Sequence, residues 1–95
     1  MRAITQDSVN AFLNRENFKK ANMQVAVMGG KWYLKLHNNI IAVLHDCGTL
    51  MISNAGWFSN TTKERLNALP SVSIVQKNFV WYLNGSEWDR NLTEV

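Results

Sequence analysis

The chain has 95 residues, of which 46% are hydrophobic and 18% are charged, and its formal net charge is +3. This balance excludes a disordered chain, which would combine low hydrophobicity with high net charge. No apolar run approaches the ~20 residues of a membrane-spanning helix, and the single cysteine excludes an internal disulfide. We therefore expect one globular domain over residues 1–95, with no signal peptide and no membrane partner.

Residues 5–16 are expected to form the first helix. Thr5 can accept a hydrogen bond at the helix start, which makes it the predicted N-cap residue. Val9, Phe12 and Leu13 then fall on one face at the helical spacing of three and four residues. This face would pack on the strands that follow.

Residues 22–55 contain four runs of alternating apolar residues separated by short joints of glycine, asparagine or cysteine. Such joints are typical of β-hairpins, because tight turns need residues that tolerate positive φ. The pattern predicts a four-stranded antiparallel meander. The expected two-residue turns are Gly29-Gly30, Asn38-Asn39 and Cys47-Gly48.

The predicted turns set the strand registers, pairing Val25 with Leu34 across the first turn and Leu34 with Val43 across the second. The third turn pairs Val43 with Ile52. Because side chains alternate between faces along a strand, the three registers place one apolar set on the same face. This predicted core face consists of Met23, Val25, Val27, Trp32, Leu34, Leu36, Ile41, Val43, Leu50 and Ile52.

A second helix is expected over residues 61–69. Thr61 and Glu64 have the spacing of a capping box, in which each side chain bonds the other residue's backbone amide. Pro70 then ends the helix, because proline lacks the backbone donor that a continuing helix requires.

Residues 72–84 are expected to form a second hairpin, with Lys77 and Asn78 as its turn. This register places Phe79 on the core face of the hairpin, together with Trp81. After the hairpin comes a polar tail, which Trp88 is expected to anchor on the body.

The element order αββββαββ predicts the α+β class. We expect one antiparallel sheet of about six strands, made of the four-stranded meander and the C-terminal hairpin, with two short helices on its apolar face.

Four motifs stand together in the chain: Gly56-Trp57 before Ser59, the run Thr61–Asn67, the run Val80–Gly85, and Trp88-Asp89. With them the chain resembles a family of small, uncharacterised proteins of tailed bacteriophages, over residues 18–90. The resemblance implies a phage protein made in the bacterial cytoplasm, and it implies no activity. The departures are His37-Asn38-Asn39 for the family's His-Gly-Asn, and Trp88-Asp89-Arg90 for its Trp-Asp-Gly.

His45, Asp46 and Cys47 are the one cluster of ligand-type side chains in the sequence. Zinc sites take three or four ligands, and no second cysteine or paired histidine lies near these three. Cys47 could act as a nucleophile with His45 as its base, but neighbours in a tight turn rarely hold that geometry. We expect no metal, no cofactor and no enzymatic activity.

The start of the second predicted helix is a secondary candidate site. Free backbone N–H groups at a helix start bind anions, and hydroxyls and cations gather here. A plain capped helix also accounts for the threonines and the glutamate. The candidate anion-binding residues are Ser59, Thr61, Thr62, Lys63 and Arg65.

The second sheet face is too apolar for a freely solvated surface and too polar for a core, which is typical of a binding surface. The centre of this face is expected at Tyr33, Lys35 and His37, which occupy alternate positions of one strand. Met51, Tyr82 and Lys77 are expected beside them. The full predicted face is Gln24, Ala26, Met28, Tyr33, Lys35, His37, Ile40, Ala42, Leu44, Met51 and Ser53, extended by Val75, Val80 and Tyr82.

The leading hypothesis for function is a non-catalytic phage accessory protein that binds and modulates a host or defence protein through this face. The alternative is a nucleic-acid-binding module, in which bases stack on an aromatic and basic platform and phosphates lie near Lys31 and Lys77. The platform residues would be Tyr33, Lys35, His37 and Tyr82. The small charge excess speaks against it. Two further alternatives are self-association into a homo-oligomer, and coverage of the face by the C-terminal tail or a helix.

Overall fold

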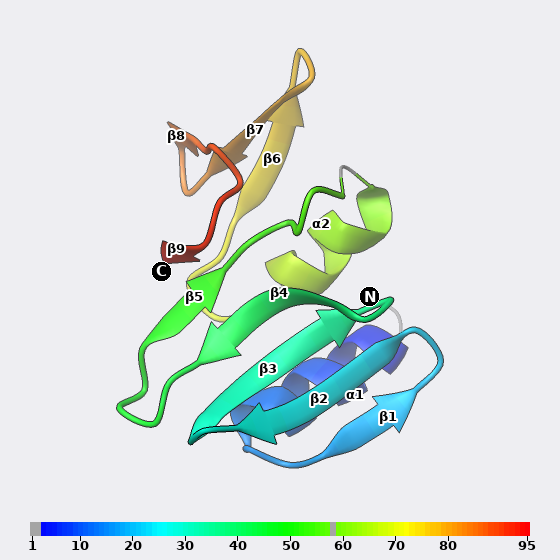
Figure 1. Ribbon diagram of the computed structural model, residues 1–95. Helices are drawn as coiled ribbons and strands as arrows, with labels where there is room; N and C mark the ends of the chain where they lie inside the picture. Colours follow the sequence, from blue (N-terminus) through cyan, green and yellow to red (C-terminus); the bar gives the residue numbers. More distant parts are fainter. Residues whose placement is uncertain (1–2, 58) are drawn as a thin grey trace.

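The computed structural model describes residues 3–57 and 59–95. Within these residues the chain forms a helix, five strands, a second helix and four strands (Figure 1). All of the described strand pairs are antiparallel. The α+β class is therefore confirmed, with two sheets where one was expected.

The larger sheet has six strands in the order β1-β2-β3-β4-β5-β9. Its four central strands are the predicted meander, and a short strand pairs at each edge. The strands are β1 Phe18–Lys20, β2 Met23–Met28, β3 Lys31–Leu36, β4 Asn39–Leu44, β5 Leu50–Ile52 and β9 Thr93–Glu94.

The predicted C-terminal hairpin does not join that sheet. It forms a separate three-stranded sheet of β6 (Ile74–Lys77), β7 (Val80–Leu83) and β8 (Ser86–Glu87). The second helix contacts a strand of each sheet, β4 and β6, and in Figure 1 the β6–β7 hairpin projects away from the larger sheet. Alternation predicts that strands exist, but it does not say which sheet a strand joins.

The first helix, α1, spans Ala3–Leu13 and lies behind β1, β2 and β3 in Figure 1. The predicted range 5–16 was shifted, and Thr5 is not the N-cap: it lies inside the helix with its side chain fully buried. The helix ends early because Arg15 adopts a positive φ of 54°. The Glu16 amide then donates to the Ala11 carbonyl at 2.8 Å, as in a Schellman motif.

The second helix, α2, spans Asn60–Asn67. Ser59, and not the predicted Thr61, is its N-cap, because the Ser59 hydroxyl accepts the Thr62 backbone N–H at 3.1 Å. The predicted capping box was therefore misplaced by two residues.

The register of the first hairpin is as predicted: Val25 pairs with Leu34 across Gly29-Gly30. The next two registers were wrong. The second turn is His37-Asn38, with Leu36 opposite Asn39. A β-bulge then follows, because Leu34 pairs with Ala42 while Lys35 pairs with Ile40, which leaves Ile41 without a partner on β3.

The bulge exchanges the faces of β4. Ala42 and Leu44, predicted on the second face, belong to the core, and Val43 lies opposite Tyr33 and Met51 on the other face. The third turn is also longer than predicted. It is a loop at 45–49 in which the Gly48 amide donates to the His45 carbonyl at 2.9 Å.

The core is a single cluster beneath the larger sheet, and it includes residues of both helices and of the β6–β7 hairpin. Val27 and Trp32 were predicted in it, but Val27 is exposed and Trp32 is only partly buried, because this pair lies next to the Gly29-Gly30 turn at the end of the hairpin. Trp88 anchors the tail, as predicted. The largest fully buried side chains are Trp81, Arg65, Phe12, Met23, Leu34, Ile41, Ile52 and Leu66.

Candidate functional site

The face of the larger sheet that α1 does not cover is turned toward the viewer in Figure 1; we call it the open sheet face. One row crosses four of its strands, in which Ala26 pairs with Tyr33, Tyr33 with Val43, and Val43 with Met51. Val43 is only 6% exposed although no helix packs on this row, because Tyr33 and Met51 flank it. The row therefore forms a small apolar platform.

A more polar row runs beside this platform. Lys19 pairs with Gln24, Gln24 with Lys35, and Lys35 with Ile40. Neither row contains an acid in β1 to β5, and the nearest paired acid is Glu94 of the edge strand β9, opposite Met51. The open sheet face thus combines an apolar platform with a positively charged border.

The structure divides the predicted binding site. Tyr33 and Lys35 of β3 and Met51 of β5 do lie together on the open sheet face, with β4 between the two strands. His37 does not lie on the face, since it occupies the β3–β4 turn with a φ of 51°. Tyr82 and Lys77 belong to the other sheet. The C-terminal tail does not cover the face, because β9 extends its edge.

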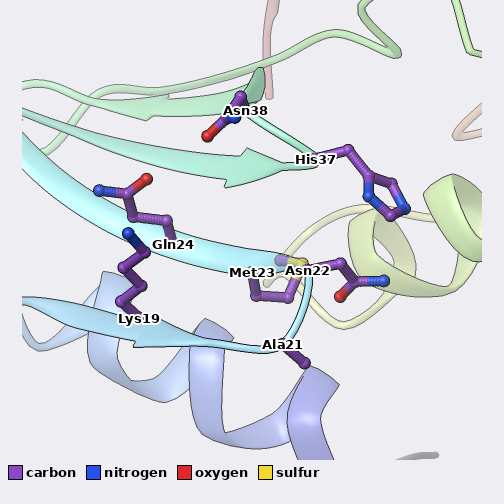
Figure 2. A pocket seen from close by; sticks show the side chains of 7 residues that line it. All are labelled: Lys19, Ala21, Asn22, Met23, Gln24, His37 and Asn38. Carbon is purple, nitrogen blue, oxygen red and sulfur yellow. The ribbon is translucent and has the colours of Figure 1, made fainter.

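A pocket of about 270 Å³ lies at one end of the open sheet face, between the β1–β2 and β3–β4 turns. Figure 2 shows the side chains of Lys19, Gln24 and Asn38 on one side of it, and the His37 imidazole directed away from them toward α2. An ammonium and two amides can donate hydrogen bonds to a carboxylate or to a backbone carbonyl. The residues that line the pocket are Lys19, Ala21, Asn22, Met23, Gln24, His37 and Asn38.

His37 also borders a second pocket, of about 230 Å³, at the start of α2. This pocket brings His37 together with Ser59, Thr61 and Thr62 of the predicted anion site, and with Trp57, which is 56% exposed. Sequence reasoning did not assign Trp57 to any site.

The two cations of the predicted anion site are engaged elsewhere. Lys63 Nζ donates to Gln76 Oε1 at 2.8 Å and lies 5.8 Å from the ring centroid of Trp81. Arg65 is 1% exposed and donates to Thr5 Oγ1 at 2.5 Å, with Glu64 as its ion-pair partner. The structure therefore does not assemble the five candidate residues around the helix start.

The loop with His45, Asp46 and Cys47 is an exposed hairpin connection. Across residues 3–57 and 59–95, no three histidine, cysteine, aspartate or glutamate side chains are grouped so that they could hold a metal. Cys47 Sγ lies 3.3 Å from Thr49 Oγ1. This side-chain hydrogen bond, supported by the Thr49 backbone, lowers the pKa of the Cys47 thiol from its ordinary value.

The tip of the β6–β7 hairpin differs from the prediction. Its turn is Asn78-Phe79, both at positive φ, and Lys77 pairs with Val80. Phe79, predicted in the core, is 90% exposed. The observed register differs from the predicted one by two residues, which keeps every strand residue on the same face, so alternation alone could not distinguish the two.

The outer face of this hairpin carries a second apolar surface. Val75 pairs with Tyr82 there, and a hollow of about 330 Å³ lies over Val75, Lys77 and Tyr82. Val75 is 56% exposed. We call this surface, with the turn residue, the hairpin stripe: Val75, Lys77, Phe79, Val80 and Tyr82.

These features define an α+β protein with two antiparallel sheets and two exposed surfaces of mixed apolar and basic character. A family model described as the Kyanoviridae Gp96 protein matches residues 1–94. The chain therefore belongs to this family of tailed-phage proteins. Searches of the curated proteins and of the solved structures found no match. Neither described helix has the length and hydrophobicity needed to cross a membrane.

Proposed function

We propose that this phage protein acts in the host cytoplasm as a non-catalytic accessory protein, and that it binds and modulates a host or defence protein through the open sheet face. The observation that carries the proposal is the row of Tyr33, Val43 and Met51. These residues lie side by side on adjacent strands, and neither described helix covers them.

Tyr33 is suited to be the anchor of such a contact. It lies between Ala26 and Val43 on neighbouring strands and is half-buried, so part of its side chain is already packed before any partner binds. Little side-chain entropy is then lost on binding. Tyrosine is also among the residues that contribute most to interface energies, and methionine is enriched at interfaces.

The charges of the face favour a partner with acidic side chains. Lys19 and Lys35 border the platform, and Lys31 lies on the next row opposite Met28. Complementary charges raise association rates and select among partners. An acidic patch with an apolar centre on the partner would match this arrangement.

Nucleic-acid binding is the second candidate function, and the specific observation in its favour is the placement of Tyr33 between the rows that contain Lys31 and Lys35. Against it, Tyr82 lies on the other sheet, so the open sheet face offers one aromatic ring. Sheet platforms that bind single strands stack two or three bases.

The test combines the substitutions Tyr33→Ala and Lys35→Ala with capture of partners from infected and uninfected host lysates, with and without nuclease. We expect the double variant to lose the partner and still to fold, with a modest fall in melting temperature, because Tyr33 and Lys35 are half-buried and lie outside the core cluster. Leu92→Ala and Lys20→Ala, both exposed and off this face, are the matched controls.

Retention of the partner by the double variant would exclude the open sheet face as the contact surface. Loss of capture after nuclease treatment, with a steep fall of affinity in salt, would instead favour nucleic acid. A concentration-dependent change in sedimentation that Tyr33→Ala abolishes would favour self-association.

A further inference from the structure

Phe79 is the most exposed large hydrophobic side chain among the described residues, at 90%. It occupies the turn at the end of the β6–β7 hairpin, which in Figure 1 reaches away from the rest of the molecule. Below it, Val75 and Tyr82 continue the apolar surface along the outer face of the hairpin.

The backbone at this turn is unfavourable for phenylalanine. Asn78 and Phe79 have φ values of 52° and 66°, the pattern of a type I′ turn. Asparagine suits the first of these positions, but the second strongly favours glycine. A bulky residue at positive φ is strained, and no packing of the exposed ring offsets that strain within this chain. Backbone strain that no packing within the chain offsets is typical of functional positions.

The base of the hairpin is held firmly, so the tip is presented in a fixed direction. The Asn67 side chain bonds both backbone groups of Ile74, accepting from its N–H at 2.6 Å and donating to its carbonyl at 3.1 Å. Asn84 connects Ser73 and Ser71 in the same way, at 2.9 Å each. A pre-organised element loses less freedom when it binds.

We propose that the hairpin stripe is a second binding surface, in which Phe79 inserts into an apolar pocket of a partner protein that carries a carboxylate at its rim. We expect a carboxylate on the partner because Lys77 adjoins the turn and β6 and β7 contain no acidic residue that could pair with it. The nearest acid on the outer face is Glu87, opposite Tyr82 at the far end from the turn.

A second copy of this chain does not fit the stripe as its partner. At about 3.4 Å per residue and about 4.8 Å between strands, the outer face of the two four-residue strands covers about 130 Å². A stable interface takes about 800 Å² from each partner. Two stripes in contact would fall short of this and would oppose their Lys77 side chains. A concave partner encloses the stripe, the tip and the flanks together.

The test places p-benzoylphenylalanine, a photo-crosslinking residue, at position 79 of the full chain in infected cells, and at Leu92 as an exposed apolar control outside both proposed surfaces. Mass spectrometry identifies the crosslinked protein and the peptide that was labelled. We expect position 79 to label one site on one protein, with apolar and acidic residues around it, and position 92 not to label that site.

Binding of the purified pair then compares two glycine variants that relieve the same turn. Phe79→Gly removes the ring and should weaken affinity at least tenfold, whereas Asn78→Gly keeps the ring and should leave affinity within about twofold. Lys77→Gln should weaken association mainly at low salt.

Four results would overturn the inference: equal labelling from positions 79 and 92, crosslinks only to a second copy of this chain, Phe79-dependent flotation with anionic lipid vesicles, or unchanged affinity of Phe79→Gly. If Phe79→Gly binds the partner normally while the Tyr33→Ala, Lys35→Ala variant does not, the hairpin stripe is excluded as a binding surface. The proposed function of the open sheet face is then still supported.

Discussion

Arg65 of α2 donates a hydrogen bond to the hydroxyl of Thr5 in α1 at 2.5 Å, across 60 residues of sequence. Thr5 in turn donates to Glu64 Oε1 at 2.7 Å, so that one hydroxyl joins both members of an ion pair. Arg65 also reaches Asn22 Oδ1 at 3.4 Å, which ties the β1–β2 turn to the two helices.

Thr5→Val should therefore destabilise the protein by about 1–3 kcal/mol, because it keeps the shape of the side chain and removes the two hydrogen bonds that the hydroxyl makes with the charged Arg65 and Glu64. Thr5→Ser keeps the hydroxyl and is the matched control. Urea denaturation of both variants measures the difference. Equal free energies of unfolding for Thr5→Val and Thr5→Ser would show that the hydroxyl contributes nothing.

Phe79→Gly should stabilise the fold by about 1–2 kcal/mol, because glycine adopts positive φ without strain and the exposed ring gives up no packing. For a domain of this size each kcal/mol raises the melting temperature by roughly 4–8 °C. Phe79→Ala, which removes the ring but keeps a Cβ, is the control and should gain less. A lower melting temperature for Phe79→Gly would mean that the turn is not strained.

Cys47 should react with iodoacetamide at lower pH than an ordinary exposed thiol, because its pKa is lowered and the thiolate is the reactive form. Thr49→Val removes the side-chain hydrogen bond, which is the largest cause, and should move the pH–rate curve upward. Rates measured across neutral pH on both proteins test this. Superimposable curves would contradict the assignment to Thr49.

Trp88→Ala should release the last strand and cost about 3–5 kcal/mol, since Trp88 is 5% exposed and packs against Trp81 with ring centroids 6.4 Å apart. Its indole N–H also donates to Thr93 Oγ1 at 2.9 Å, within β9. Hydrogen exchange should show faster exchange of the Val95 amide, which donates to the Leu50 carbonyl. Trp57→Ala, at an exposed tryptophan, should leave both stability and exchange nearly unchanged.

The first hairpin was predictable because Gly29-Gly30 marks one tight turn, and Gln24, Lys31 and Lys35 mark the outward positions on the two strands. The second was not, because residues 40–44 read Ile-Ile-Ala-Val-Leu, a run without polar positions from which to read a face. The bulge at Ile41 adds one residue within this run, and every later face on β4 changes with it.

The positions of the candidate site residues were likewise predictable only in part. Tyr33 and Lys35 were placed on the correct sheet face because that face follows from alternation beside the Gly29-Gly30 turn. Met51 also lies on that face, because the bulge in β4 and the longer loop at 45–49 shift the predicted register in ways that offset one another. Tyr82 was misplaced because sheet membership depends on tertiary packing, which a local pattern does not contain. Phe79 was missed because a phenylalanine at the glycine position of a turn contradicts the turn preferences used to find hairpins.

The pairing of β9 with β5 has a consequence for synthesis on the ribosome. Thr93 lies opposite Ile52, so the edge of β5 stays open until the segment 93–95 has emerged. Until then the meander presents an unpaired, apolar strand to every other nascent chain nearby, and unpaired edges promote aggregation. Translation speed over the last forty or so codons, and the chaperones that meet the chain there, should therefore influence how much of it reaches the folded state.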